Sequence, residues 1–254
     1  MKVEVVPCGF LKVDAEKMHN HSPSAGKWSD YNPDAAGFMR ISMNGLLVEV
    51  GEQVVLFDPG CADFLPSRLL ASYGLEIPVP LEVALEILGY HADQVTDVIF
   101  THLHFDHGSG AFLRKPGRIE KRLPNARYHV LREHFEYAGK PDRSESGSYA
   151  TFLFRKLEQL YWLEDWTEEW MRFQVFYGHT RGMVVPGILT PKGMVWYLTD
   201  LIPLTSFMQP LISSAYDLDP ELARREKSEF LTGIRDQVEL IFYHDPLISK
   251  MIYP

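Results

Sequence analysis

The chain has 254 residues, of which 46% are hydrophobic and 23% charged, a composition typical of a globular protein with a substantial core. Its two cysteines exclude a disulfide framework. The net charge of −9 disfavours nucleic acid as a partner, because acidic surfaces repel phosphate, and we identify no basic run that reverses this locally. No apolar run reaches the roughly 18 residues of a membrane span, and the first residues do not resemble a signal peptide. We therefore expect a soluble, cytoplasmic protein that binds neither nucleic acid nor membrane.

Short apolar runs between turn residues predict strands along the whole chain. In chain order they cover 2–7, 41–50, 53–57, 95–100, 127–131, 173–177, 187–190, 194–199 and 240–243. Residues 19–33 are rich in polar and turn-forming types and predict a loop. Helices are predicted at 80–89, 149–170 and 219–231, the last beginning at Asp219-Pro220. Because strands and helices do not simply alternate, we expect layered sheets flanked by helices.

Four side chains that commonly bind metals lie within six positions after the predicted strand 95–100. They are His102, His104, Asp106 and His107. Side chains two positions apart in an extended chain point to the same side, and the turn that follows can bring Asp106 and His107 back toward them. Imidazole and carboxylate donors suit zinc, and also iron or manganese. Since one ion takes about four ligands including water, these four side chains fit two adjacent ions better than one.

Three further candidate ligands stand directly after later predicted strands. His179 follows 173–177, Asp200 follows 194–199, and His244 follows 240–243. The ends of strands are where sheets of α/β proteins present functional groups. We therefore predict that these three side chains complete the metal site begun by His102–His107.

Five short motifs carry a resemblance to a known family. In order they are Phe57-Asp58-Pro59-Gly60, Thr101-His102-Leu103-His104-Phe105-Asp106-His107, Gly178-His179-Thr180, Thr199-Asp200 and His244-Asp245. They span roughly residues 40 to 246 and resemble the metallo-β-lactamase superfamily. Within it they are similar to the dinuclear hydrolase branch, with quorum-quenching lactonases and methyl parathion hydrolase-like members.

The resemblance implies an α/β fold, a four-layer αββα sandwich of two mixed sheets flanked by helices. Residues 1–254 would form this single domain, with a helical insertion at about 132–170. Two divalent metal ions are implied as cofactors, with zinc expected first and iron or manganese as alternatives. The implied roles are as follows: His102, His104 and His179 hold the first ion, Asp106, His107 and His244 hold the second, Asp200 bridges both, and Asp58 orients a ligand from behind.

The implied activity is hydrolysis by a hydroxide shared between the two ions, with Asp106 as a catalytic residue that shuttles its proton. The acidic charge and aromatic content favour a small, neutral, apolar ester-like substrate: a lactone, ester, thioester or phosphotriester. Two departures from the family stand out. Arg181-Gly182-Met183 replaces the Pro-Gly-His that relatives often have, so the loop beyond the ligand His179 differs. No Tyr follows Asp200 closely, which weakens the lactonase interpretation and not the metal site. An iron-dependent thiol or persulfide dioxygenase and an RNA-processing nuclease of the same fold remain alternatives.

Several features allow two interpretations. The aromatic residues between 149 and 170 form either core or the wall of a substrate pocket. The apolar segment 201–216 either covers the site or pairs with a second subunit in a homodimer. Cys61 follows Asp58-Pro59-Gly60 and either lies near the metals or is a buried inert thiol, which is the interpretation we favour. We interpret His91, His129 and His134 as ordinary structural histidines.

Overall fold

The computed structural model describes residues 1–20, 27–157 and 159–254. The chain divides into two compact units, each taken by itself below. Unit 1 comprises Met1–Gly9 and Met43–Thr167, and unit 2 comprises Phe10–Ser42 and Glu168–Pro254. The long strands β1 (Lys2–Asp14) and β2 (Phe38–Val50) contribute residues to both units. The assignment of residues 1–254 to a single domain stays a prediction.

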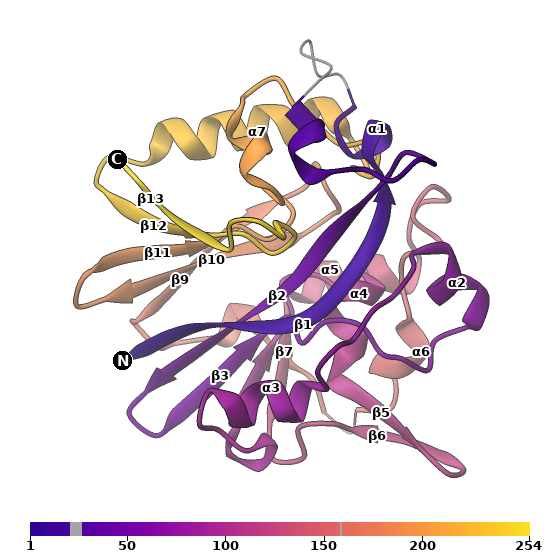
Figure 1. Cartoon of the computed structure of the whole chain (residues 1–254). Coiled ribbons are helices and arrows are strands. Elements are labelled where there is room, and N and C mark those ends of the chain that lie inside the picture. The colour runs from indigo at the N-terminus through magenta and orange to yellow at the C-terminus, as the bar shows by residue number, and fades with distance from the viewer. Residues whose placement is uncertain (21–26, 158) are drawn as a thin grey trace. The chain divides into compact units, whose positions relative to one another are not determined.

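Unit 1 is built on a mixed sheet in the order β1-β2-β3-β4-β7-β8 (Figure 1). Its further strands are β3 (Gln53–Phe57), β4 (Asp97–Ile99), β7 (Arg127–Val130) and β8 (Tyr161–Trp162). β2 and β3 are antiparallel, with Val50 opposite Gln53, whereas β3, β4, β7 and β8 run parallel. The middle strands are buried and consist of near-continuous apolar runs, as expected of parallel strands covered on both faces.

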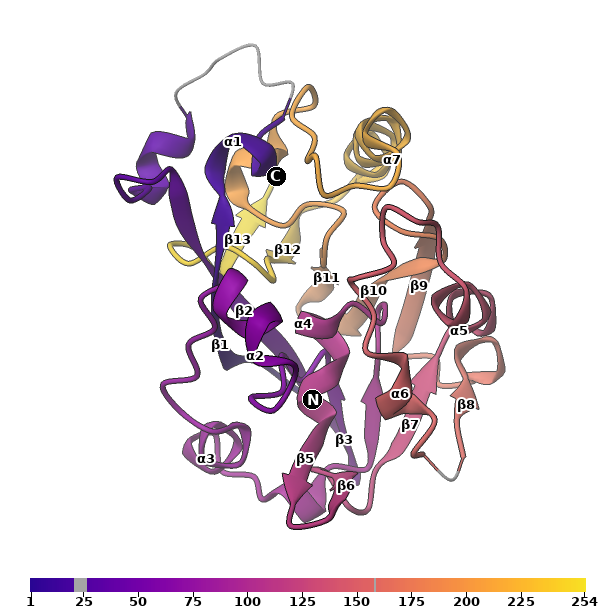
Figure 2. The same cartoon turned by 90° about the vertical axis from the view of Figure 1, so that its right-hand side faces the viewer.

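Short helices surround this sheet. They are α2 (Ser67–Ser72), α3 (Leu81–Ile87), α4 (Phe105–Gly108), α5 (Arg132–Gly139) and α6 (Thr151–Phe154), with 3₁₀ turns at Ala92–Gln94, Ser109–Ala111 and Leu163–Asp165. A two-stranded hairpin, β5 (Phe112–Lys115) with β6 (Arg118–Lys121), lies at the outer edge of unit 1 (Figures 1 and 2).

Unit 2 carries the second mixed sheet, in the order β13-β12-β11-β10-β9. Its strands are β9 (Met171–Phe176), β10 (Met183–Thr190), β11 (Gly193–Tyr197), β12 (Val238–Ile241) and β13 (Lys250–Tyr253). Only β11 and β12 pair in parallel; the other neighbours are antiparallel. Its remaining elements are α1 (Ala15–Met18), α7 (Pro220–Gly233) and 3₁₀ turns at Lys27–Tyr31 and Thr205–Met208.

Helix α7 begins and packs as its sequence dictates. The Asp219 side chain accepts the Leu222 N–H at 3.0 Å, and Pro220 occupies the first turn, where its missing N–H costs nothing. The helix lies along one face of the sheet of unit 2 (Figure 1), with the Phe230 ring against Phe176 and Trp196. Gly178 permits this approach, because a Cβ there would lie 2.2 Å from the Ala223 nitrogen.

The predicted mixed sheets with flanking helices are confirmed, as is the hairpin 41–57. Each of the nine predicted strands overlaps an observed strand, and the predicted helices at 80–89 and 219–231 overlap α3 and α7. The prediction of one helix over 149–170 is wrong beyond α6. Tyr161–Trp162 instead forms β8, because it pairs in parallel with β7, with Tyr161 opposite His129. The predicted loop 19–33 contains a 3₁₀ turn at Lys27–Tyr31, and residues 21–26 lie outside the described residues.

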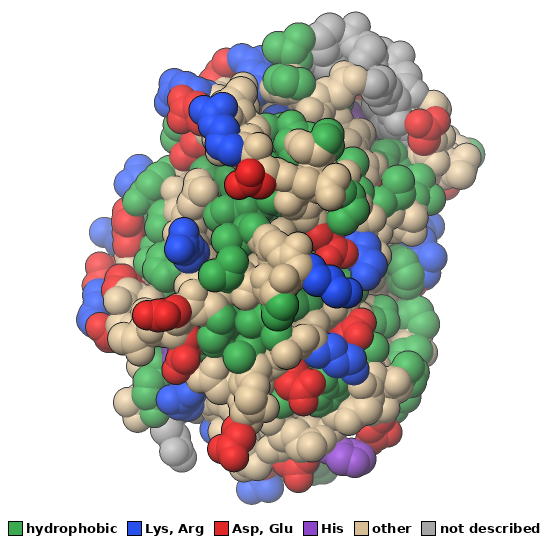
Figure 3. Space-filling model, turned by 90° about the vertical axis from the view of Figure 1, so that its left-hand side faces the viewer, with side chains coloured by type: hydrophobic (Ala, Val, Ile, Leu, Met, Phe, Trp, Pro, Cys, Tyr) green, Lys and Arg blue, Asp and Glu red, His purple; other side chains and the backbone are tan. Residues whose placement is uncertain are grey.

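The charged side chains are distributed less evenly than the net charge of −9 suggests. The face in Figure 3 intersperses Lys and Arg with Asp, Glu and hydrophobic side chains. The β5–β6 hairpin, in contrast, gathers the cations of Arg114, Lys115, Arg118 and Lys121, with Glu120 as the acid among them. Arg122, directly after β6, pairs with Glu82. The expectation that no local basic run exists is therefore wrong. Among the described residues, no helix is long and apolar enough to cross a membrane; the cytoplasmic location stays a prediction.

Candidate metal centre

The ligand motif of unit 1 lies at the carboxyl end of β4. His102 and His104 follow the strand in extended backbone, and α4 begins at Phe105, so that Asp106 and His107 stand on a helical turn. His102 Nε2 lies 3.1 Å from His104 Nδ1, and the His102 and His107 ring centroids are 3.9 Å apart. His107 Nε2 lies 4.0 Å from an Asp106 oxygen. Unit 1 therefore brings together all four predicted ligands of this motif.

Asp58 stands behind this motif, where β3 ends. It has the left-handed φ of 45°, which is uncommon for a residue other than glycine and turns its side chain back toward residue 101. One carboxylate oxygen accepts the Thr101 N–H at 2.9 Å, and the other lies 3.0 Å from His107 Nδ1. Burial raises the pKa of Asp58, and the hydrogen bonds from His107 and Thr101 oppose that rise. A carboxylate at Nδ1 places the ring proton there, which leaves Nε2 of His107 as a donor atom.

Two residues that the sequence analysis did not single out as site residues also hold the motif. Glu145 Oε1 lies 3.0 Å from His104 Nε2, and its side chain is buried. His134 Nε2 accepts the N–H of Leu103, between the two first histidines, at 2.8 Å. The interpretation of His134 as structural is consistent with this bond. No pattern in the sequence marks Glu145, because it lies 41 residues beyond His104 in an irregular segment.

The predicted ligands of unit 2 converge on Asp200. One of its oxygens lies 3.1 Å from His179 Nε2, and the other lies 3.3 Å from His244 Nε2. Thr199, directly before it, has a φ of 48°, a strained conformation for a β-branched residue, and such strain concentrates at functional sites. This turn at the end of β11 directs Asp200 away from the strand.

The other ring nitrogen of each histidine in unit 2 also has a partner. His179 Nδ1 lies 2.9 Å from Asp217, and His244 Nδ1 lies 2.8 Å from the Ser42 carbonyl oxygen. Burial lowers the pKa of His179, but Asp200 and Asp217 outweigh it and raise that pKa to about 10. Two buried carboxylates beside one imidazole form a negatively charged environment, which a bound cation would balance.

The five histidines share one arrangement, which tests whether the donor set fits a metal. Each has an acceptor or hydroxyl on one ring nitrogen, and the other nitrogen faces a further predicted ligand of its own unit, which is Asp200 for both His179 and His244. The outer partners are Thr101 for His102, Glu145 for His104, Asp58 for His107, Asp217 for His179 and Ser42 for His244. Metal-binding histidines commonly have such partners, which fix the tautomer, so the residues present fit a site with imidazole and carboxylate donors.

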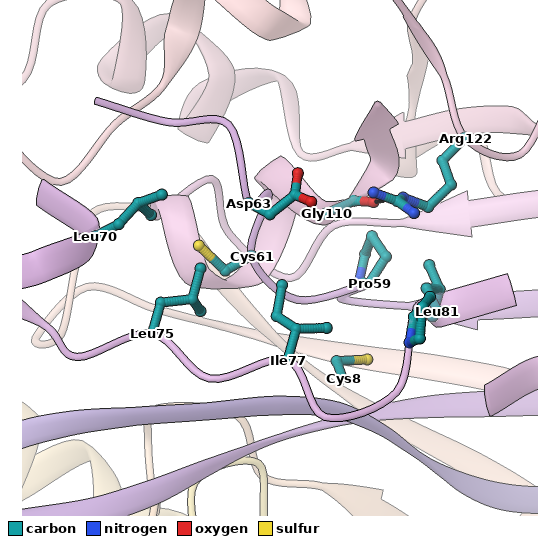
Figure 4. A pocket seen from close by; sticks show the side chains of 11 residues that line it. Cys8, Pro59, Cys61, Asp63, Leu70, Leu75, Ile77, Leu81, Gly110 and Arg122 are labelled. Carbon is teal, nitrogen blue, oxygen red and sulfur yellow. Dashed lines mark hydrogen bonds between the residues drawn. The ribbon is translucent and has the colours of Figure 1, made fainter. Parts of the chain in front are cut away.

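A cavity of about 360 Å³ in unit 1 is lined by Cys8 and Cys61 together with apolar side chains such as Leu75, Ile77 and Leu81 (Figure 4). Burial raises the pKa of the Cys8 thiol to about 12 and also raises that of Cys61, to which Asp106 adds a repulsive charge. Both thiols are therefore neutral, in agreement with the interpretation of Cys61 as an inert buried thiol near the predicted ligands.

The model of the metallo-beta-lactamase superfamily matches residues 42–195. The chain belongs to the metallo-β-lactamase superfamily. The predicted fold class of this superfamily is thereby confirmed, with its mixed sheets and flanking helices. A search of curated proteins found no match.

Several solved structures resemble this chain over nearly its whole length. A probable metal-dependent hydrolase from Staphylococcus aureus has a TM-score of 0.87 at 22% identity, covering 99% of this chain and 92% of its own. AidC, a dizinc quorum-quenching lactonase in complex with a product, has a TM-score of 0.76 at 21% identity, covering 98% and 88%. An N-acyl homoserine lactone hydrolase with N-hexanoyl-L-homoserine at its catalytic metal centre has 0.72 at 20%, covering 96% and 93%. At these identities the likeness shows the fold, which is the fold expected from the motifs.

Proposed function

We propose that the protein is a dinuclear metal-dependent hydrolase of small, neutral, ester-like molecules. In this proposal His102, His104 and His179 hold one divalent ion, Asp106, His107 and His244 hold the other, and Asp200 bridges them. Zinc is the ion we expect, because imidazole and carboxylate are its usual ligands in catalytic sites, and iron or manganese would be accepted by the same donors.

The observation that carries the proposal is the position of Asp200 between two histidines. Its two carboxylate oxygens face His179 Nε2 and His244 Nε2 separately, at 3.1 and 3.3 Å. The two histidines belong to different ions in the proposed set. A carboxylate that presents one oxygen toward each ion's histidine has the arrangement that a bridging ligand requires.

The side chains have distinct roles in this reaction. When bound, the two ions would supply an acidified water and polarise the carbonyl or phosphoryl oxygen of the substrate. Asp106 is the most exposed of the four predicted ligands of unit 1, with 14% of its side chain exposed, so it is suited to hold or pass on a proton at a carboxylate oxygen. Asp58 holds the His107 ring through Nδ1 at 3.0 Å. Burial raises the pKa of both cysteine thiols, which disfavours the thiolate form, so the proposal assigns no nucleophilic role to a cysteine.

An apolar substrate is supported by the surroundings of Asp106. The Phe105 ring packs against Tyr73, with ring centroids 5.0 Å apart. Burial is the main cause that raises the pKa of Tyr73, and the negative charge of Asp106 raises it further. Phe154, from the segment expected to be core or pocket wall, is core: its ring packs against Phe100 and Phe112. Aromatic faces near a polar centre are typical of sites for neutral ligands.

Substrate profiling tests the proposal. The protein is stripped of metal with a chelator, reloaded with zinc, iron(II) or manganese, and given a lactone, a carboxylic ester, a thioester and a phosphotriester. We expect metal-dependent hydrolysis of at least one class, lost in the stripped protein. Inactivity on all four with every ion would contradict the proposal. Oxygen uptake with a thiol or persulfide would replace it by a dioxygenase function, and metal-dependent RNA cleavage by a nuclease function.

Two further expectations are independent of the reaction. A homodimer stays open, and its measurement is the molar mass in solution. Within unit 2, the segment 201–216 is held to helix α7 by the buried Lys227, whose ammonium group donates to the carbonyl oxygens of Gln209 and Ile212. A small-molecule partner is the one the proposal requires.

A further inference from the structure

Glu145 is a buried carboxylate whose side-chain partners include a proposed metal ligand. Glu145 is 4% exposed. Oε1 lies 3.0 Å from His104 Nε2. The Tyr137 hydroxyl donates to Oε2 at 2.5 Å, and the Tyr149 hydroxyl donates to Oε1 at 3.3 Å. Burial of a carboxylate is costly unless its oxygens are hydrogen-bonded, and here both oxygens are.

The backbone around Glu145 is fastened directly to the ligand motif. The Phe105 N–H donates to the Ser148 carbonyl at 2.8 Å, and the Ser148 N–H donates to the Glu145 carbonyl at 2.8 Å. His104 and Tyr149 form an antiparallel bridge, and their rings pack with centroids 4.8 Å apart. The carboxylate therefore cannot shift far from His104 without breaking bonds that also hold the start of α4.

We propose that Glu145 is a positioning residue for the metal ligand His104, a role that rests on the proposed function. By accepting the Nε2 proton, Glu145 leaves Nδ1 of His104 as the donor atom. It also holds this Nδ1 on the side of the ring that faces His102 Nε2, and these two nitrogens are 3.1 Å apart. The carboxylate also increases the electron density of the imidazole and so strengthens its bond to a cation. Tyr137 and Tyr149 act one step further back, by holding the carboxylate itself.

His104 is distinct among the five histidines in the nitrogen that it presents. His102, His107, His179 and His244 have their outer partners on Nδ1, whereas His104 has its outer partner on Nε2. A flip of the His104 ring would put Cε1 where Nε2 now lies and so lose the Glu145 hydrogen bond. The segment 132–150 therefore contributes to the proposed site through Glu145, which contacts His104 on the nitrogen opposite the donor atom.

Glu145→Gln and Glu145→Ala test this role in the full-length protein, with Glu136→Gln as the control. Glu136 is an exposed carboxylate on α5, the helix that carries Tyr137. The measurements are zinc stoichiometry, zinc affinity by competition with a chromophoric chelator, and the visible absorption spectrum of the cobalt(II)-substituted protein. The thermal unfolding midpoint of each variant shows whether it is folded, and Glu145→Gln preserves side-chain volume if the alanine variant does not fold.

We expect Glu145→Ala to weaken one of the two zinc ions by about 10–100-fold and to leave the other close to wild type. Glu145→Gln should lie between, since its amide oxygen can still accept the His104 proton but carries no charge. The cobalt(II) spectrum should change in both variants and not in Glu136→Gln. Tyr137→Phe should weaken the same ion by less than Glu145→Gln does, because the carboxylate remains.

Two other outcomes have separate meanings. If the wild-type protein binds two ions and Glu145→Gln retains both affinities and an unchanged cobalt(II) spectrum, the positioning role is wrong while the proposed function stands. If the wild-type protein binds no metal, the proposed function itself fails, and the positioning role with it. In ¹⁵N-histidine spectra of the zinc form, a His104 bound through Nε2 would also overturn the inference.

Discussion

Two buried aspartate–histidine pairs of unit 1 show the difference between a structural pair and one prepared for a cation. Asp58 contacts His107 at the carboxyl end of β3. Asp97 is the first residue of β4, and its carboxylate lies 2.7 Å from His129 Nε2. Both carboxylates are 0% exposed. Asp97 is also bonded to Arg127, whose Nε lies 2.8 Å from Asp97 Oδ1, whereas the side chain of Asp58 is bonded to Thr101 and His107.

The charges of the two carboxylates respond in opposite directions. Burial raises the pKa of Asp97, but the hydrogen bonds from His129, Arg127 and Thr96 outweigh it, so that its pKa is lowered. Burial of Asp58 wins over its hydrogen bonds, so that its pKa is raised. The structural pair thus contains a permanent cation, Arg127, whereas the side chain of Asp58 contacts Thr101 and the proposed metal ligand His107. In the proposed function, the metal ion held by His107 would supply the positive charge beside Asp58.

Removal of a proposed metal ligand should have the largest effect. Asp200→Ala is expected to lower kcat/KM on the best substrate by at least about 10³-fold, since metal ions contribute several kcal/mol to hydrolytic transition states. Asp97→Asn changes a carboxylate that is equally buried but structural, and it should leave kcat/KM near wild type. An equal loss in both variants would remove the distinction between the two kinds of carboxylate.

A smaller effect is expected from Asp58→Asn, which keeps the side chain's volume and removes its charge. Without the carboxylate at Nδ1, His107 is oriented less firmly and is a weaker ligand, so zinc affinity should fall by about 10–100-fold. Chelator competition measures this, with Asp97→Asn as the matched control. Unchanged affinity in Asp58→Asn would place Asp58 with the structural carboxylates.

Asp97→Asn should act on stability instead. Its loss of charged hydrogen bonds to Arg127 and His129 is expected to lower the free energy of unfolding by about 1–3 kcal/mol, toward the lower end because the Arg127 side chain is 51% exposed. A carboxyl with a lowered folded pKa stabilises the protein above its unfolded pKa of about 3.9, and this contribution is lost as the pH falls through the folded pKa. Urea unfolding between pH 7 and pH 3 should therefore show a smaller acid loss in Asp97→Asn. Parallel curves would contradict the role assigned to Asp97.

The smallest effect is expected at the β5–β6 hairpin. Lys115 and Arg118 pair with Glu120, and Arg114 lies over the Phe64 ring, so part of its positive charge is already engaged. Lys121→Glu should leave hydrolysis unchanged, and any association of the wild type with RNA should vanish at about 0.2 M salt. Binding that persists at this salt and is lost in Lys121→Glu would favour the nucleic-acid alternative.

The parts of the site that could be predicted from sequence are local and chemically dense. His102, His104, Asp106 and His107 lie within six positions, and His179, Asp200 and His244 each follow an apolar strand. Their partners could not be predicted, because Glu145 and Asp217 come from irregular segments 41 and 38 residues away from the histidines they contact. Tertiary packing, which has no period in the sequence, places these carboxylates.

The same limit explains the errors in the fold. The aromatic spacing at 149–170 is near that of a helix. Tyr161 and Trp162 are nevertheless extended and pair with β7, because pairing within the sheet overrides the local pattern. The β5–β6 hairpin was missed because most of its side chains are polar and exposed, so that it lacks the apolar run by which the other strands were recognised.

The central claim is that the side chains named from the sequence hold two cations. Diffraction from zinc-grown crystals, with data collected on both sides of the zinc absorption edge, tests it most directly. We predict two anomalous peaks per chain, one contacting His102, His104 and His179, the other Asp106, His107 and His244, with Asp200 touching both. Absence of any peak at these side chains, in protein that takes up no stoichiometric metal in solution, would contradict the claim.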